Sequence, residues 1–163
     1  MTKLQVLKYN LATLNHVNMR LENGETLHDI VSNSSVIHIF GAGLNPEKPA
    51  HTAVKELSDR GWAIAPIHPR DAGATINGFP IRPKLDSGIV AEIVVLFLAP
   101  ERAREVVRSL IINHSPDDFP LIWFQHGAED EDSFCALDEL GANYVANDCI
   151  VVNSNENDLK CAN

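Results

Sequence analysis

The chain is poor in cysteine: 163 residues contain only Cys135, Cys149 and Cys161. An odd number of cysteines without paired spacing argues against a disulfide framework and against a zinc site. The first ten residues also lack the long apolar core and the small-residue cleavage pattern of a signal peptide. We therefore expect a cytoplasmic protein that keeps its thiols reduced.

The chain also lacks long hydrophobic runs and an excess of positive charge. Its longest apolar run, residues 93–99, is far shorter than the ~20 residues that a membrane-spanning helix needs. Lys and Arg number 13 against 22 Asp and Glu, which gives a formal net charge of −9. Because nucleic acids and anionic membranes are bound largely through Lys and Arg, this composition argues against both kinds of partner.

The negative charge is concentrated near the C-terminus. Residues 126–163 contain nine Asp or Glu and one Lys, so about eight of the nine net negative charges lie there. A site for an anionic ligand is therefore expected in the rest of the chain, where backbone N–H groups and a few local cations would hold it.

Short apolar runs alternate with amphipathic stretches from residue 34 onward, as expected for one globular domain of this length. We predict strands over residues 36–40, 62–67, 92–98, 121–124 and 143–145. We predict helices over residues 26–32, 52–60, 100–111 and 129–140. This alternation indicates an α/β protein, in which a Rossmann-like, doubly wound parallel sheet lies in three α/β/α layers with an extra N-terminal segment.

Three parts are expected along the chain: an N-terminal extension over residues 1–33, the Rossmann-like domain over 34–154 and a polar, frayed tail over 155–163. Residues 3–21 could form a hairpin, an extra edge strand or a partner-dependent arm. Residues 71–84 are rich in Gly and Pro and are predicted to form a loop with one short strand near Ile81.

The most informative segment follows the first predicted strand of the sheet and contains Gly41, Gly43, Asn45 and Lys48. In a doubly wound sheet, ligands bind beyond the carboxyl ends of the strands. Glycines let the backbone approach a pyrophosphate, the following helix offers free N–H groups, and Lys48 adds a positive charge. The alternative is that Gly41-Ala42-Gly43 only makes a tight turn.

The segment departs from the dinucleotide fingerprint, because Pro46 stands where a third glycine is expected. After the second strand the chain has His68-Pro69-Arg70 instead of an acidic residue that would hold a ribose diol. Arg70 suits a phosphate on the ribose. Coenzyme A (CoA), with its 3′-phosphate, and NADP, with its 2′-phosphate, both remain candidates, whereas NAD is disfavoured.

At these residues the chain resembles the small stand-alone CoA-binding proteins, which are related to the CoA-binding domain of succinyl-CoA synthetase. The resemblance covers residues 36–151 and rests on these motifs: Gly41-Ala42-x-x-Asn45-Pro46-x-Lys48-Pro49, His68-Pro69-Arg70-Asp71-Ala72-Gly73, Gly78-Phe79-Pro80, Trp123-Phe124-Gln125-His126-Gly127 and Asp148-Cys149-Ile150. Members of this family often have Ser where this chain has Gly43 and Asn where it has His68. The third strand of the family usually ends with a basic residue, whereas residues 98–100 here have none.

The resemblance implies a Rossmann-like module that binds CoA or an acyl-CoA without assured catalysis. It implies a phosphate end lined by Gly41, Ala42, Gly43, Asn45 and Lys48. It implies that His68, Pro69 and Arg70 flank the adenosine. We also predict Gln125 and His126, at the end of the fourth strand, as binding residues. The other interpretation of His126 is a rim residue that does not contact a ligand phosphate or thioester.

Motifs for other chemistry are missing. The seven histidines form no metalloprotease pattern, and the sequence has neither a nucleophile elbow nor a P-loop. We predict no metal site and no catalytic residue, His38 as a core residue, and Cys149 as a small buried residue, with thiol exchange near a CoA sulfur as its alternative role.

Two other functions remain open. An NADP-dependent oxidoreductase would need a proton donor such as Tyr-x-x-x-Lys, but neither Tyr9 nor Tyr144 has a lysine four residues on. A protein-interaction module could keep the fold after its pocket had decayed, which would fit the missing cation after the third strand. Because exposed apolar faces of small sheets often pair, a homodimer is also expected.

Overall fold

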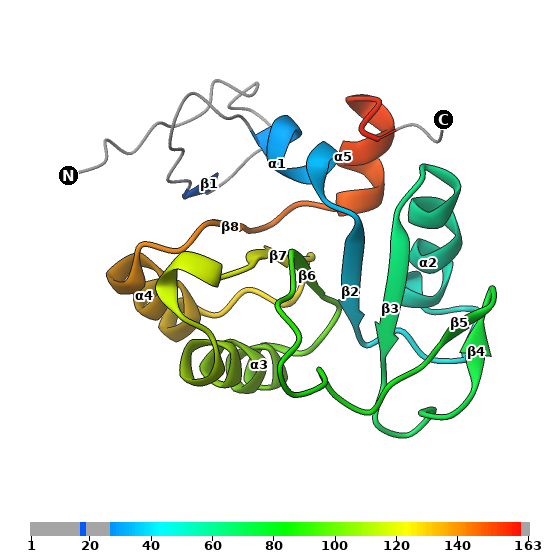
Figure 1. Ribbon diagram of the computed structural model, residues 1–163, viewed down its shortest axis with the longest axis horizontal. Coiled ribbons are helices and arrows are strands. Elements are labelled where there is room, and N and C mark those ends of the chain that lie inside the picture. The colour runs from blue at the N-terminus through cyan, green and yellow to red at the C-terminus, as the bar shows by residue number, and fades with distance from the viewer. Residues whose placement is uncertain (1–16, 19–26, 161–163) are drawn as a thin grey trace.

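The computed structural model describes residues 17–18 and 27–160 (Figure 1). Five parallel strands form its central sheet in the order β8-β7-β6-β2-β3, and β1 joins the β8 edge in the antiparallel sense. The strands are β1 (Val17–Asn18), β2 (Val36–Phe40), β3 (Ala63–Ile67), β6 (Ile93–Leu96), β7 (Leu121–Phe124) and β8 (Tyr144–Val145). The predicted doubly wound, Rossmann-like fold is confirmed.

The two central strands explain why the sheet is parallel and covered on both faces. Every residue of β6 and β7 is buried, and the two strands pair in register from Ile93 opposite Leu121 to Leu96 opposite Phe124. Continuous apolar runs of this kind are stable only where helices cover both sides of a sheet.

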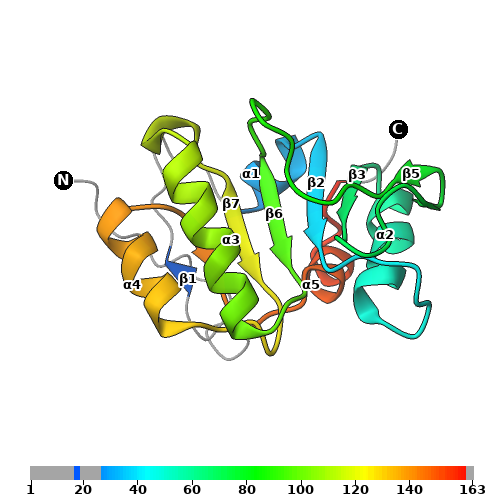
Figure 2. The same cartoon turned by 90° about the horizontal axis from the view of Figure 1, so that it is seen from below.

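Helices pack on both faces of the sheet (Figure 2). One core cluster joins the sheet to α1 (Leu27–Asn33), α2 (Pro49–Asp59) and α5 (Ile150–Glu156). The other joins it to α3 (Pro100–Asn113) and α4 (Glu131–Leu140), and a short 3-10 helix, Pro116–Asp118, follows α3. The four predicted helices therefore exist, each within three residues of its predicted bounds.

The connection from β3 to β6 differs from the prediction. Residues 71–84 contain two short strands, β4 (Thr75–Ile76) and β5 (Phe79–Pro80), which pair as a hairpin instead of leaving one strand near Ile81. The turn between them, Asn77-Gly78, has φ values of 48° and 83°. Two residues with positive φ are what a tight hairpin turn of matching twist requires.

The C-terminal segment also differs from the predicted frayed tail. Residues 150–156 form α5, and Leu159 is only 3% exposed. The Arg60 side chain donates hydrogen bonds to the Leu159 carbonyl oxygen at 2.8 Å and to the Asp158 carboxylate at 2.8 Å. These contacts hold the segment against the end of α2.

Of the three predictions for residues 3–21, the edge strand is found at Val17–Asn18, which pairs with β8. The rest of that segment lies outside the described residues.

Candidate functional site

The order of the strands creates a natural ligand site beside β2. From β2 the chain moves to β3 on one side, and from β6 it continues through β7 to β8 on the other. The connections therefore leave β2 and β6 in opposite directions, and a crevice opens beyond the carboxyl ends of these two strands. The glycine-containing loop after β2 lies at this point.

Gly41 is held tightly where the strands end. Its N–H donates to the Ile67 carbonyl oxygen at 2.8 Å, and its φ is 95°. A Cβ at this position would lie 2.3 Å from the carbonyl oxygen of Phe97, the residue after β6. Only glycine therefore lets β2 turn this close to the neighbouring strand.

Gly43 packs against the segment that follows β3. The N–H of Leu44 donates to Asp71 Oδ2 at 2.9 Å, and the Asp71 N–H donates to His68 Nδ1 at 3.2 Å. A Cβ on Gly43 would lie 2.4 Å from Asp71 Oδ2 and 2.8 Å from His68 Cδ2. The His68 ring and the Asp71 carboxylate thus occupy the space that a side chain at position 43 would need.

The loop then leads into the N-terminus of α2. Asn45 Oδ1 accepts a hydrogen bond from the Glu47 N–H at 3.0 Å, which shapes the turn. Lys48 is the N-cap residue of α2, and its side chain makes no capping hydrogen bond. The Lys48 ammonium and the positive end of the helix dipole therefore lie beside the same loop, an arrangement that favours a bound phosphate.

A pocket of about 260 Å³ lies between the loop and the end of β3, lined by Gly41, Gly43, Asn45, Lys48, His68, Arg70 and Asp71. All but Asp71 were predicted from the sequence. The structure therefore brings the residues expected at the phosphate end and at the adenosine end into one pocket.

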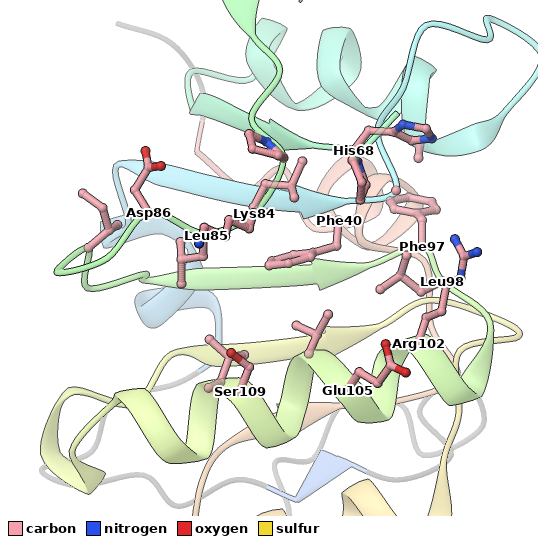
Figure 3. Close-up of a pocket in the computed structure, with 18 of the residues that line it drawn as sticks. Phe40, His68, Lys84, Leu85, Asp86, Phe97, Leu98, Arg102, Glu105 and Ser109 are labelled. Carbon is pink, nitrogen blue, oxygen red and sulfur yellow. The ribbon is translucent and has the colours of Figure 1, made fainter. Parts of the chain in front are cut away.

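This pocket adjoins a much larger groove of about 1660 Å³, which shares Gly41, Lys48, His68 and Arg70 with it and also takes in Pro69. The groove runs over the sheet between α3 and residues 83–90 (Figure 3). In Figure 3 Phe40 lies on the sheet, with Leu85 of the loop on one side and Glu105 and Ser109 of α3 on the other.

Two predicted residues, Ala42 and Gln125, have buried side chains, whereas a third, His126, lies at the groove as predicted. The Ala42 side chain is 0% exposed and belongs to the core, so only its backbone could face a ligand. Gln125 is 5% exposed and accepts a hydrogen bond from the Ile150 N–H at 2.9 Å, which fixes the start of α5. His126 lines the groove, and its Nδ1 lies 2.8 Å from Asn147 Oδ1.

Sequence reasoning missed two cations at this site. The third strand ends without a basic residue, but Arg102 lines the groove from the first turn of α3 (Figure 3). The signal was present, because Pro100 marks the start of a helix and places Arg102 within its first turn, beside the strand end. Lys84, on the opposite wall, is a further cation that the sequence did not single out.

Two polar groups near the sheet, one buried and one partly buried, have shifted pKa values. His38 is 9% exposed, and burial lowers its pKa despite the nearby carboxylates of Glu92 and Asp86. Burial also raises the pKa of Asp148, although this carboxylate accepts hydrogen bonds from the Cys149 N–H at 2.8 Å and from Asn153 at 2.9 Å. These contacts give Asp148 a structural role at the start of α5, next to the partly buried Cys149.

Within residues 17–18 and 27–160, no cluster of three or more His, Cys, Asp or Glu side chains could hold a metal ion. Over the same residues, no helix combines the length and hydrophobicity needed to cross a bilayer.

The chain is similar in sequence and structure to several known proteins. The protein YneT of Bacillus subtilis is 25% identical over 127 residues, which cover 77% of this chain and 90% of YneT. A solved structure from Thermus thermophilus, cell-free ID.343, superposes with a TM-score of 0.70 at 26% identity, covering 80% of this chain and 95% of that one. A hypothetical protein from Pyrococcus horikoshii gives a TM-score of 0.67 at 26% identity, covering 82% and 92%.

The family described as "CoA binding domain" matches residues 35–155, a stretch that runs from β2 to α5 and contains both the glycine loop and the end of β3. The chain therefore belongs to the CoA-binding domain family.

Proposed function

We propose that the protein is a binding module for CoA or an acyl-CoA, and that the pyrophosphate lies on the loop from Gly41 to Lys48. One observation supports this most directly. Gly41, Gly43, Lys48, His68 and Arg70, from the ends of two neighbouring strands and the start of α2, line one pocket. Backbone close to the ligand, a helix N-terminus and a lysine together form an anion site.

The nucleotide end would lie beside the end of β3. Pro69 and Arg70 line the groove there, and Arg102 faces it from α3. We propose that the adenosine lies between these segments and that Arg70 and Arg102 bind the ribose phosphate. Guanidinium groups suit phosphate because they offer paired N–H donors in one plane. Arg102 also meets the main objection from the sequence, which was the missing cation after the third strand.

The proposal is for binding without catalysis. His126 and Cys149 are two groups near the carboxyl edge with chemistry to offer, and each already has a structural position in the fold. His126 is paired with Asn147, and Cys149 is the N-cap residue of α5. We therefore assign neither a reaction step.

The test is thermal unfolding with CoA, 3′-dephospho-CoA, NADP and NAD, each in excess. A ligand that binds only the folded protein raises the midpoint temperature of unfolding. At a ligand concentration of a hundred times Kd, it adds about 2.7 kcal/mol to the free energy of unfolding. CoA should give the largest shift, and dephospho-CoA a smaller one. Lys48→Ala should reduce the shift, whereas Lys55→Ala should not, because Lys55 pairs with Asp59 on the exposed face of α2.

Two outcomes would favour the other functions. A shift with NADP and none with CoA would indicate an NADP-binding protein. No shift with any nucleotide would indicate that the fold has lost its ligand and acts through protein partners. A cytoplasmic location and a homodimer remain predictions.

A further inference from the structure

The groove exists because one crossover has no helix. In a doubly wound sheet, the connection from β3 to β6 normally supplies a helix that covers β2 and β3. Residues 68–92, all of them described, contain instead the β4–β5 hairpin and a loop. The sheet face beside α3 is therefore covered only in part, and Phe40 and Ile67 form the floor of the groove.

The walls of the groove separate apolar from polar groups. On α3, Val106 and Leu110 follow Arg102 at intervals of four residues, so all three lie in one row along the helix. The next row, Glu105, Ser109 and Asn113, forms the rim. Leu85 packs from the opposite loop against the same core cluster as Val106. The interior is thus apolar along most of its length, under a polar rim.

Charge gives the groove a direction. Lys48, Arg70 and Arg102 lie at the end near the carboxyl edge of the sheet, whereas Asp118 lies at the far end, beyond α3. The loop wall between the two ends carries both a cation, Lys84, and a carboxylate, Asp86. An anionic group is therefore favoured most at the first end, and an uncharged apolar group fits the remainder.

Size also argues for an occupant beyond a nucleotide. Ligand pockets usually have volumes of about 300–1,000 Å³, and this groove reaches about 1660 Å³. From Arg102 to Asn113 the wall formed by α3 is about 17 Å long, at the ~1.5 Å rise per residue of a helix.

We propose that this groove binds an unbranched acyl chain, with its carbonyl end toward the carboxyl edge of the sheet and its tail along Phe40, Val106 and Leu110. The chain could arrive as a CoA thioester or as a free fatty acid. The thioester form rests on the proposed function, whereas the free-acid form does not.

Calorimetric titration distinguishes these sources. Wild-type protein is titrated with CoA, acetyl-CoA, decanoyl-CoA and decanoate, the last with and without CoA, all below the concentrations at which they form micelles. Each methylene removed from water is expected to increase the affinity roughly fourfold. Decanoyl-CoA should therefore bind at least about tenfold more tightly than acetyl-CoA, even if only about two of its additional methylenes are buried. Binding of decanoate itself would identify the free acid as the source and would support the proposal equally.

A variant that fills the groove makes the test specific. Ser109 is exposed on the rim, so Ser109→Trp should fold normally while blocking the groove. It should remove the advantage of decanoyl-CoA, or the binding of decanoate, and leave CoA binding unchanged. The control Ile112→Trp adds the same side chain at an 80% exposed position of α3 that does not line the groove, and should change neither.

The results separate the two proposals. Equal affinities for acetyl-CoA and decanoyl-CoA together with no binding of decanoate would overturn the acyl groove, and CoA binding would stand. An acyl preference that survives Ser109→Trp would also overturn it. If CoA fails to bind while decanoate binds and loses its affinity in Ser109→Trp, the groove stands and the proposed function fails.

Discussion

At the residue scale, two glycines with nearly the same backbone differ sharply in their surroundings. Gly41 and Gly73 have φ values of 95° and 96°. A Cβ on Gly41 would meet the Phe97 carbonyl oxygen at 2.3 Å, whereas a Cβ on Gly73 would have nothing within 4 Å. Comparing the two positions therefore distinguishes two costs of adding a side chain: the strain of a positive φ, which both share, and the steric clash with the Phe97 backbone, which only Gly41 has.

We predict that Gly73→Ala lowers the free energy of unfolding by about 1–2 kcal/mol, the cost of placing an L-residue at positive φ. Gly41→Ala should cost clearly more, because the Phe97 backbone must move as well. Urea unfolding of both variants measures the difference. Equal losses would show that the end of β6 moves away from the new methyl group without cost.

His38 gives the second prediction at this scale. Because its pKa is lowered by burial in the folded state, the unfolded chain binds a proton first as the pH falls below the ordinary value of 6.5. The contribution of neutral His38 to the free energy of unfolding is therefore complete above pH 6.5. It decreases as the pH falls from 6.5 toward the lowered pKa of the folded state. The slope cannot exceed about 1.4 kcal/mol per pH unit for one proton.

The corresponding experiment compares His38→Val with wild type in urea unfolding between pH 7.5 and 5. The variant should lose less stability than wild type over this range. Identical pH slopes in His38→Val and wild type would contradict the assignment of a neutral, buried imidazole.

Residue-level prediction from sequence succeeded where backbone conformation decided the outcome. Gly41, Gly43, Lys48 and Arg70 follow strand ends, so their place at the carboxyl edge depends on the fold alone. Side-chain direction was harder to predict. Gln125 also follows a strand end, but its side-chain amide oxygen turns inward and accepts a hydrogen bond from the Ile150 N–H. Ile150 lies 25 positions further along the chain, and no local sequence pattern connects the two residues.

At the element scale, α3 and α4 are joined through Asp130. This carboxylate accepts two hydrogen bonds from Arg104 Nε at 3.1 Å, and it caps α4 by accepting one from the Ser133 N–H at 2.9 Å. The hydrogen bonds from Arg104, opposed by burial and aided by Ser133, lower the pKa of Asp130 to about 2.

Asp130→Ala should therefore destabilise the protein by about 1–2 kcal/mol through the lost cap alone, and further through the lost hydrogen bonds from Arg104. Asp130→Asn should cost less, because the amide oxygen can still cap the helix. Stability from Asp130 is complete above pH 3.8 and decreases as the pH falls toward about 2. Urea unfolding at neutral pH ranks the variants, and equal losses for Ala and Asn would contradict the capping role.

The elements with long apolar runs were predicted correctly, as were the short α1 and β8, whereas the β4–β5 hairpin and α5 were not. The Asn77-Gly78 pair is a strong hairpin signal, but strands of two residues are too short to show alternation. Helix α5 was missed because its sequence, IVVNSNE, has low helix propensity. Its buried Ile150 and Ser154, both 0% exposed, show that packing stabilises it.

At the scale of the whole molecule, the order of strands and helices was predictable and the groove was not. Apolar runs at regular intervals, with one helix after most of them, specify a doubly wound sheet. A groove over β2 and β3 depends on how residues 83–90 pack against α3, which is set by tertiary contacts. The absence of a helical pattern in residues 68–92 was the only hint in the sequence.

The central claim is that CoA binds with its phosphates on the loop after β2. Titrating isotope-labelled protein with CoA, and following backbone amide signals by NMR, tests its position directly. The signals of residues 41–48, 68–71 and 102, apart from Pro46 and Pro69, which have no amide proton, should move most, and those of the β8 edge should stay in place. Changes confined to other surfaces, or no changes at millimolar CoA, would contradict the account.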